Sequence, residues 1–475
     1  MAWDENQQRL AAALRAHRPG SGVPHVVVSL PSLSIAASLL AHYGARLPVL
    51  EHRYLLGLTR LARVRDCELV FVCSVAPSAD VVDDYLDLLP ARDRADCRRR
   101  FRVLAVGDPS PRALSAKLLA RPDLVERLRQ WVGDRPAFLD PWNVTGDEVR
   151  IADALGMPVN GTAPHLEVLA RKSAGRRLLR DAGVPVPVGV EDVRSPEAVL
   201  AAVADLRGSL PGCHGVVVKT DDSGAGDGNR VLRWDEEDRP CDSVAAFPDW
   251  YVADLAEGGI VEELVEGVRF ASPSVQVDLV PDGPPQVLAT HEQVLGGEGG
   301  QVYQGCTFPA ADEYAARLGE YGLAAARTLA RRGALGRLSV DFAVSSAPGE
   351  PWRIAALEMN LRKGGTTHPL DALSSLVPGR YDVAAARWVT RDGSSRFYEA
   401  TDNLVDPAWR GREARDVLDA VRAAGLRFDP VTGVGVVMHM LLGLEVDGRI
   451  GLTAIGRSRE HAADLFLRTG EVLRA

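Results

Sequence analysis

The chain has 475 residues, of which 46% are hydrophobic and 25% are charged, as in an ordinary soluble protein of about two to four domains. Its formal net charge of -9 argues against nucleic acid or an anionic membrane surface as the main partner, because both would repel it. The first residues are acids and amides, and the apolar run 434–446 is interrupted by His439 and Glu445. We therefore expect a cytoplasmic protein without a signal peptide or a membrane span.

The cysteines and lysines are both informative. The six cysteines are scattered and include no C-x-x-C pair, so the sequence indicates neither a zinc site nor a disulfide framework. Nearly all basic residues are arginines, and the lysines are Lys117, Lys172, Lys219 and Lys363. A lysine offers a compact point charge where an arginine offers a planar fork, which suggests that these positions need a compact charge.

The first 160 residues alternate between buried strands and helices. Strands are expected at 25–30, 67–73 and 101–106, and helices at 79–89 and 111–131. This order predicts a three-layer α/β domain that ends near residue 160. The segments Tyr43-Gly44-Ala45 and Glu51-His52-Arg53-Tyr54 are either ligand contacts or ordinary loop and helix-start residues.

Two lysines follow the turn-rich connector 158–164. Lys172 lies in a helix expected over 165–182, and Lys219 ends a short strand that begins at Gly215. The strand runs into the Gly- and Asp-rich loop 220–229, in which backbone amides and the lysine could cradle phosphates. A hairpin turn is the alternative interpretation, and the loop is not a Walker motif.

The next strands carry polar side chains. Residues 259–267 form a strand that runs into an acidic turn, suited either to adenine and ribose contacts or to solvent. A hairpin is expected from 272–280 and 289–294, with Ser274 and Gln276 on one face. His291 in its second strand is either a site residue or a hydrogen-bonded structural histidine. A helix over 312–331 follows.

The segment that best indicates chemistry runs from Glu358 to His368. Glu358 and Asn360 project from the same side of a strand end, and the antiparallel partner strand 338–344 brings Asp341 beside them. These oxygen atoms suit Mg²⁺, which keeps substrate phosphates among its other ligands. Arg362 could hold a phosphate or an oxyanion. The alternative is a strand that ends in a solvated polar loop.

More donors follow in the same segment, namely Lys363, Gly364, Gly365, Thr366, Thr367 and His368. The glycines allow backbone amides to approach an anion closely. Past Pro378 the pattern predicts a helix over 404–426, strands over 433–445 and 448–455, and a closing helix over 458–473.

In their order, these pieces resemble the ATP-grasp superfamily. They are Lys172, Lys219 with its loop, Glu262-Glu263-Leu264-Val265, Asp341, and the Glu358, Asn360 and Arg362 group. The chain is more closely similar to the pheganomycin-type peptide ligases. The segments that carry this likeness are 358–369, Ser272-Pro273-Ser274-Val275-Gln276, Gly305-Cys306-Thr307-Phe308-Pro309 and 433–439, and it spans most of the chain.

The resemblance implies an α/β fold, in part α+β. An ATP-grasp domain at 161–380, with a lid at about 185–265, would follow a Rossmann-like pre-ATP-grasp domain at 1–160. A small C-terminal α+β segment would occupy 381–475.

The resemblance also implies roles for single residues. Lys172 and Lys219 would hold ATP phosphates under a loop that includes Ser223, Gly224, Gly226 and Gly228. Glu262, Glu263 and Val265 would line adenine. Many ATP-grasp enzymes have a ribose-binding Glu about where Arg269 stands, and Glu266 could replace it. Asp341, Glu358 and Asn360 would bind two Mg²⁺, while Arg362 and Lys219 would act in catalysis. The candidates for the substrate pocket are Ser274, Gln276, His291, Gln293 and the donors of 363–368.

The implied activity is ATP-dependent ligation of a carboxylate to an amine through an acyl phosphate. The substrates would be an amino-acid-like acid and an amino acid or peptide amine, in natural-product biosynthesis, and the resemblance leaves room for a homodimer. Two other functions stay open at this point, namely an ATP-grasp kinase that phosphorylates a hydroxyl and a nucleotide-binding scaffold without turnover.

Overall fold

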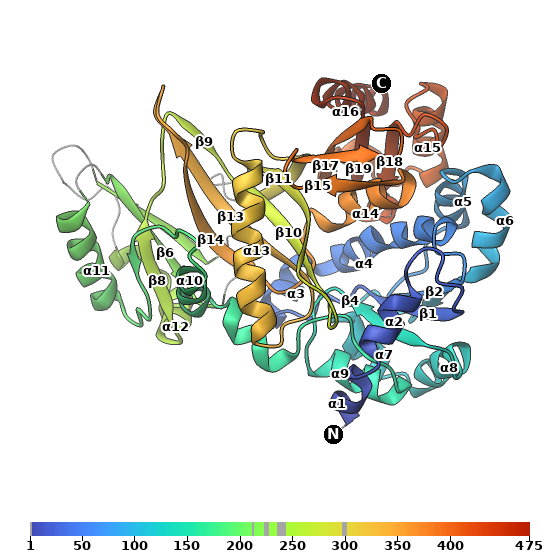
Figure 1. Cartoon of the computed structure of the whole chain (residues 1–475), viewed down its shortest axis with the longest axis horizontal. Coiled ribbons are helices and arrows are strands. Elements are labelled where there is room, and N and C mark those ends of the chain that lie inside the picture. Colours follow the sequence, from blue (N-terminus) through green and yellow to red (C-terminus); the bar gives the residue numbers. More distant parts are fainter. Residues whose placement is uncertain (1, 211–212, 223–227, 235–243, 297–301) are drawn as a thin grey trace.

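A computed structural model describes residues 2–210, 213–222, 228–234, 244–296 and 302–475. Its strands form three sheets, of four, eleven and four strands. Figure 1 shows the smaller green sheet at one end of the molecule, the large sheet in the middle, and the blue N-terminal part below the red C-terminal part at the other end. This mixed α/β architecture agrees with the expected fold class.

The N-terminal part is a parallel sheet in the order β3-β2-β1-β4. Its strands are β1 (His25–Leu30), β2 (Cys67–Cys73), β3 (Phe101–Ala105) and β4 (Ala137–Pro141). The three strands expected from the sequence are confirmed, and β4 was missed. Around them lie α1 (Ala2–Gln7), α2 (Leu10–Ala16), α3 (Ala37–Tyr43), α4 (Leu47–Glu51), η2 (His52–Ala62), α5 (Ala79–Asp87), α6 (Ala91–Arg100), α7 (Leu114–Leu119), α8 (Pro122–Val132) and α9 (Gly146–Leu155).

Two expected helices are each divided in the structure. The helix expected over 111–131 is α7 and α8, which part before Pro122, a residue that suits the first turn of a helix and interrupts its interior. The helix expected over 165–182 is the 3₁₀ segment η3 (Pro164–Ala170) followed by α10 (Lys172–Asp181). Lys172 therefore stands at the first residue of an α-helix.

The sheet within the predicted lid is antiparallel, in the order β5-β8-β6-β7. It has its own apolar core, which includes Val216, Tyr251 and Leu255. The elements are β5 (Gly189–Val190), α11 (Pro196–Ser209), β6 (Gly215–Thr220), β7 (Asn229–Arg233), η4 (Val244–Ala246), α12 (Asp249–Ala256) and β8 (Gly259–Glu263).

The large sheet joins the central and C-terminal parts of the chain. Strand β12 (Val302–Phe308) pairs with β17 (Ser395–Val405). Backbone hydrogen bonds therefore join the two sides of the predicted domain boundary at residue 380, and segment 381–475 has no separate sheet. The other strands are β9 (Arg269–Ala271), β10 (Pro273–Leu279), β11 (Gln286–Gly296), β13 (Gly336–Ser346), β14 (Arg353–Asn360), β15 (Gly379–Asp382), β16 (Arg387–Thr390), β18 (Gly435–His439) and β19 (Arg449–Gly456). Its helices are α13 (Ala315–Arg331), α14 (Thr367–Leu376), α15 (Ala414–Ala423) and α16 (Arg459–Arg474).

Sequence patterns were least successful in the C-terminal part. The helix expected over 404–426 is α15 alone, because residues 404–405 belong to β17. The strand expected over 433–445 ends at His439, and the 3₁₀ segment η7 (Leu441–Glu445) follows it. The β10–β11 hairpin and the antiparallel β13–β14 pair are confirmed.

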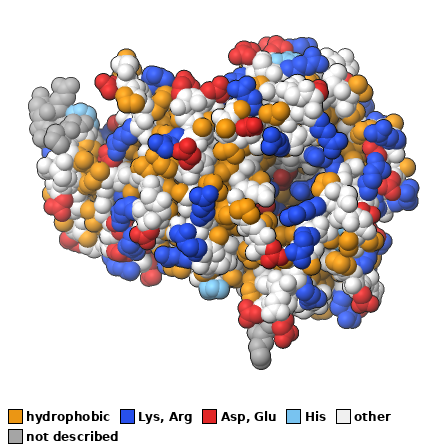
Figure 2. All heavy atoms as spheres, in the orientation of Figure 1, with side chains coloured by type: hydrophobic (Ala, Val, Ile, Leu, Met, Phe, Trp, Pro, Cys, Tyr) orange, Lys and Arg blue, Asp and Glu red, His pale blue; other side chains and the backbone are white. Residues whose placement is uncertain are grey.

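One apolar cluster joins the two ends of the chain. It contains Leu58 of η2, Leu373 of α14 and Val437 of β18, all fully buried. Figure 2 shows basic and acidic side chains interspersed over one face of the molecule. Among the described residues, no helix is both long and apolar enough to span a membrane.

A buried carboxyl group in the N-terminal part gives a test of the fold. Glu51 is 2% exposed and accepts hydrogen bonds from the backbone N–H and the hydroxyl of Ser74, at 2.6 and 2.7 Å. Burial raises its pKa from 4.5 to about 7. Between these values the unfolded chain binds fewer protons than the folded one, so stability falls as the pH rises.

We expect Glu51→Gln to remove this loss. Between pH 4.5 and pH 8, the free energy of unfolding of the variant should rise relative to that of the wild type by on the order of 3 kcal/mol, since one pKa unit is about 1.4 kcal/mol. Thermal unfolding at several pH values measures this gain, with the exposed Glu5→Gln as control. Parallel profiles of melting temperature against pH for Glu51→Gln and the wild type would contradict the assignment.

Candidate active site

The acids expected to bind metal lie together on β13 and β14. Asp341 is opposite Glu358, and the register shifts directly after this pair, leaving Leu357 without an opposite residue. Such a bulge re-aims the side chains beside it. Asn360 Nδ2 donates a hydrogen bond to Asp341 Oδ2 at 3.0 Å, and Gln293 Nε2 donates one to Oδ1 at 2.9 Å.

The carboxyl groups of Asp341 and Glu358 repel each other when both are ionised. Burial and the neighbouring Glu358 carboxylate raise the pKa of Asp341 well above its usual value. Burial alone would raise the pKa of Glu358 too, but Lys172, Lys219 and Arg362 lower it well below its usual value. A divalent cation would remove the repulsion between the acids, and an amide oxygen beside them completes the oxygen donors that Mg²⁺ prefers. The residues present therefore fit Mg²⁺.

The two lysines expected to bind phosphate come to the Asp341 and Glu358 pair from other elements. Lys172, at the start of α10, forms an ion pair with Glu358. Lys219, at the end of β6, forms one with Glu262 Oε1 at 2.6 Å. Because both ammonium groups act on the pKa of Glu358, they lie within electrostatic reach of one carboxylate.

The residues expected around adenine and ribose have internal partners. Glu262 is buried and also pairs with Arg176, while Glu263 pairs with Arg353 and accepts a hydrogen bond from the Val188 N–H at 2.6 Å. Val265 is buried just beyond β8. Glu266 forms an exposed ion pair with Arg233 of β7, at 2.6 Å.

Part of the glycine-rich loop cannot be compared with the structure. Ser223, Gly224 and Gly226 lie outside the described residues. The carbonyl of Gly228 accepts hydrogen bonds from the Tyr251 hydroxyl at 3.1 Å and from the Thr220 N–H at 3.3 Å.

Several candidate substrate residues form one hydrogen-bonded network. Gln276 Nε2 donates to Thr366 Oγ1 at 2.8 Å, and Thr367 Oγ1 donates to Gln276 Oε1 at 3.4 Å. The Gly364 N–H donates to Thr367 Oγ1 at 2.9 Å. Arg337, which the sequence did not single out, joins the network through Nη1, 3.3 Å from Gln276 Oε1.

Two further candidates lie beside this network. Ser274 pairs in register with Asp341, and its buried hydroxyl has no hydrogen-bond partner among the described residues. Gly365 faces the ring of Tyr303, which a Cβ at this position would meet at 2.6 Å. Its lack of a side chain therefore permits close packing.

The two candidate histidines are both part of the core. His291 is fully buried between Phe308 and Tyr398, and its Nε2 lies 2.6 Å from the Tyr398 hydroxyl. Burial lowers the pKa of His291 to about 3, so the ring is neutral. This environment favours the structural interpretation of His291.

His368 fixes the first turn of α14. Its Nε2 lies 2.9 Å from Asp402 Oδ1, and Arg53 Nη2 lies 2.7 Å from Asp402 Oδ2. Burial would raise the pKa of Asp402, but Arg53 and His368 lower it well below its usual range. Three segments far apart in the sequence thus meet at one carboxylate.

A small cavity lies beside the end of β14. Its lining includes Arg362 and Lys363, which the sequence singled out, and Trp142 and Arg337, which it did not. The Arg362 guanidinium lies 4.7 Å from the centre of the Trp142 ring, and Lys363 Nζ lies 2.7 Å from Asp140. Because Trp142 follows the strand that was missed, a correct prediction of β4 would have drawn attention to it.

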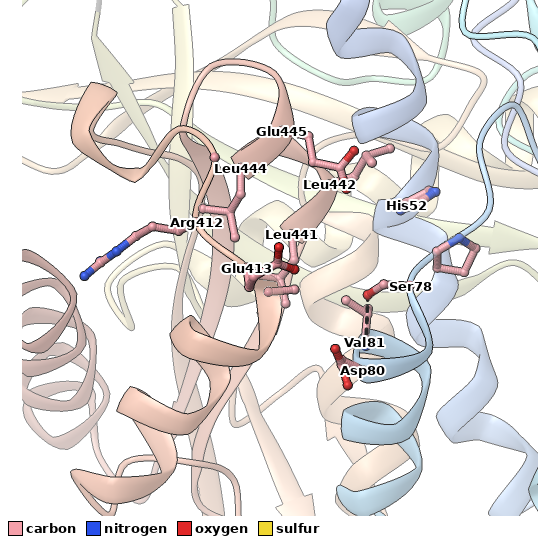
Figure 3. Close-up of a pocket in the computed structure, with 13 residues that line it drawn as sticks. His52, Ser78, Asp80, Val81, Arg412, Glu413, Leu441, Leu442, Leu444 and Glu445 are labelled. Atoms are coloured by element: carbon pink, nitrogen blue, oxygen red, sulfur yellow. Dashed lines mark hydrogen bonds between the residues drawn. The ribbon is translucent and has the colours of Figure 1, made fainter.

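A cavity of about 160 Å³ lies elsewhere, between α5 and the residues before α15 (Figure 3). Its lining includes Ser78, Glu413, Leu441 and also His52, from a segment that the sequence left open as a ligand contact. It contains none of the residues assigned to nucleotide, metal or substrate. His52 Nε2 lies 2.9 Å from the carbonyl of Val75.

Comparison with known proteins identifies the family. Residues 416–469 match the model described as the PGM1 C-terminal domain. The chain is 31% identical over 448 residues to the L-propargylglycine–L-glutamate ligase of Streptantibioticus cattleyicolor, covering 90% of each chain. It is also 22% identical over 368 residues to the IQ motif-containing protein H of Danio rerio, of which it covers 34%.

Solved structures agree in fold. The ADP complex of purK, an N5-carboxyaminoimidazole ribonucleotide synthetase, has a TM-score of 0.53 at 14% identity, covering 96% of this chain and 98% of that one. The biotin carboxylase–β,γ-ATP complex from Campylobacter jejuni has a TM-score of 0.55 at 14% identity, covering 93% and 89%. The chain belongs to the ATP-grasp ligases, and the predicted membership of the pheganomycin-type peptide ligase family is confirmed.

Proposed function

We propose that the chain joins an amino-acid-like acid to an amino acid or peptide amine, with ATP converted to ADP and phosphate. The observation that carries this proposal is the group of Asp341, Glu358 and Asn360 with Lys172 and Lys219 around it. The relative's name gives L-propargylglycine and L-glutamate as substrates of that protein, and they are the first compounds to test here.

We propose that Asp341, Glu358 and Asn360 hold two Mg²⁺ ions. Bound Mg²⁺ neutralises phosphate charge and orients the transferred group. Lys172 and Lys219 would exchange their present carboxylate partners for phosphate oxygens, which are equally good acceptors for an ammonium group. Glu262, Glu263 and Val265 would border the adenine, and Glu266 the ribose.

The reaction has two steps. A substrate carboxylate oxygen bonds to the γ-phosphorus as the bond to the ADP oxygen breaks, which gives an acyl phosphate. The amine nitrogen then attacks the acyl carbon, phosphate leaves, and the nitrogen loses a proton. Arg362 and the amides of Gly364 and Gly365 would stabilise the oxyanion, a contact worth about 3 kcal/mol.

Acyl phosphates hydrolyse, so the site has to exclude water between the two steps. The part at about 185–265 has its own core and sheet, which supports its role as a lid that moves as a unit. Gly228, at the described end of the glycine-rich loop, would border the phosphates. We also propose a division into domains at residues 160 and 380, with the domains on either side of residue 380 sharing the large sheet.

The substrates and the reaction type can be tested together. Protein amino acids and L-propargylglycine as acids, paired with the same amino acids and with dipeptides as amines, should release ADP with at least one pair, and mass spectrometry should detect the amide. With the active acid alone, hydroxylamine should trap a hydroxamate. A stable phosphorylated product instead would indicate a kinase, and ADP release from no pair would contradict the ligase.

The metal site has its own test. Glu358→Gln should lower ADP release at least about 100-fold, since it removes one anionic metal ligand and with it several kcal/mol of charge stabilisation. The melting temperature should stay within a few degrees of the wild type. The exposed Glu350→Gln, in the turn before β14, is the matched control. Near-normal turnover of Glu358→Gln would remove Glu358 from the metal site.

A further inference from the structure

The cavity beside β14 is lined by positively charged side chains. Its walls are the end of β4, the connector at 160–161, Arg337 of β13 and residues 361–363. The charged side chains among its lining residues are Arg337, Arg362 and Lys363, and none of the described carboxylates lines it. A cavity with such walls attracts an anion.

The acidic side chains that partly neutralise these cations lie outside the lining of the cavity. Asp140 holds Lys363 Nζ at 2.7 Å, whereas Asp371 and Asp278 lie 3.7 and 4.0 Å from the nearest Arg337 nitrogen atoms. The contacts of Arg337 are therefore long for ion pairs with hydrogen bonds, which are typically about 2.8 Å. The acids orient the cations without closing off the cavity.

Arg337 has hydrogen-bonding capacity to spare. Its Nη1 donates to Gln276 at 3.3 Å, and its buried Nε has no hydrogen-bond partner among the described residues. A guanidinium offers five N–H donors in a planar fork that matches a carboxylate. Only 17% of the side chain is exposed, so an ion pair formed here would be poorly screened by solvent.

The position of Arg337 separates it from the reacting group. It precedes Asp341 by four residues on β13, so both project from one face of the strand, about 13 Å apart along it. Arg362, which also lines the cavity, follows Asn360 by only two residues in the chain and so lies nearer to the metal-site residues. A substrate with one carboxylate at the metal site could thus place a second anionic group near Arg337.

We propose that Arg337, supported by Lys363, binds a substrate carboxylate that does not react, and so selects a substrate that carries one. This inference rests on the proposed ligase function. The carboxylate belongs either to the amine substrate, as the free carboxyl group of an amino acid, or to an acid substrate with two carboxyl groups. Arg337 is then a specificity-determining residue.

The test uses the active acid and amine pair from the ADP-release screen. Each substrate in turn is replaced by its carboxamide, blocked at the carboxyl group that does not react, and kcat and KM are measured for the wild type and Arg337→Ala. The wild type should prefer the carboxylate over the carboxamide form of one substrate by about 10- to 100-fold, the value of a charge-assisted hydrogen bond. Which substrate shows the preference identifies the source of the carboxylate.

Arg337→Ala should abolish that preference by raising KM for the carboxylate form, with kcat and the KM for the carboxamide nearly unchanged. Arg337→Lys should restore part of it. Arg317→Ala, an exposed arginine of α13 paired with Glu320 at 2.6 Å, is the control. Melting temperature and the affinity for a non-hydrolysable ATP analogue report on folding independently.

Three results would overturn the inference while leaving the ligase function intact. They are a wild type that does not distinguish either carboxylate from its carboxamide, a preference that survives in Arg337→Ala, and a uniform fall in kcat for all substrates. The last would place Arg337 on the reacting group. Absence of any amide product from the wild type would instead contradict the proposed function itself.

Discussion

Two carboxyl groups, Asp341 and Glu358, face each other across β13 and β14, and the surrounding structure compensates their repulsion. The compensating groups come from different elements, namely Lys172 from α10, Gln293 from β11 and Asn360 from the end of β14. The first residue of the helix that leads to the lid is thereby tied to the central sheet. The same side chains suit Mg²⁺ and phosphate. The carboxylates and the Asn360 amide can exchange their present contacts for contacts to Mg²⁺, and Lys172 can exchange its contact to Glu358 for one to a phosphate oxygen.

The loop after β14 is held at both ends. Lys363 is fixed to the N-terminal part through Asp140 and through its N–H, which donates to the Trp142 carbonyl at 3.1 Å. His368 is fixed to Asp402, which Arg53 also contacts. Arg362, directly before the first anchor, and the amides of Gly364 and Gly365, between the two anchors, are therefore placed by three parts of the chain. Such preorganised donors lose little energy to rearrangement when charge develops beside them.

The sequence predicted those features that depend on local pattern. The alternation around Glu358 and the turn at 345–349 were sufficient to place Asp341 beside it, because an antiparallel pair joined by a short turn has a restricted register. Strand β4 was missed because it has five residues and contains Asp140 and Pro141, which interrupt its apolar run. Arg337 and Trp142 carry no motif, and only the meeting of β4 with β13 and β14 brings them to one cavity. Asp402 and Arg53 likewise gain significance only through contacts between distant segments.

The most direct measurement is a crystal structure with Mn²⁺ and a non-hydrolysable ATP analogue, in which anomalous scattering locates the metal. The account predicts Mn²⁺ bound by oxygen atoms of Asp341, Glu358 and Asn360 at about 2.1 Å, close to the distances of Mg²⁺, with the Lys172 and Lys219 ammonium groups on phosphate oxygens. Metal and nucleotide bound elsewhere, with the Lys172–Glu358 ion pair intact, would contradict it.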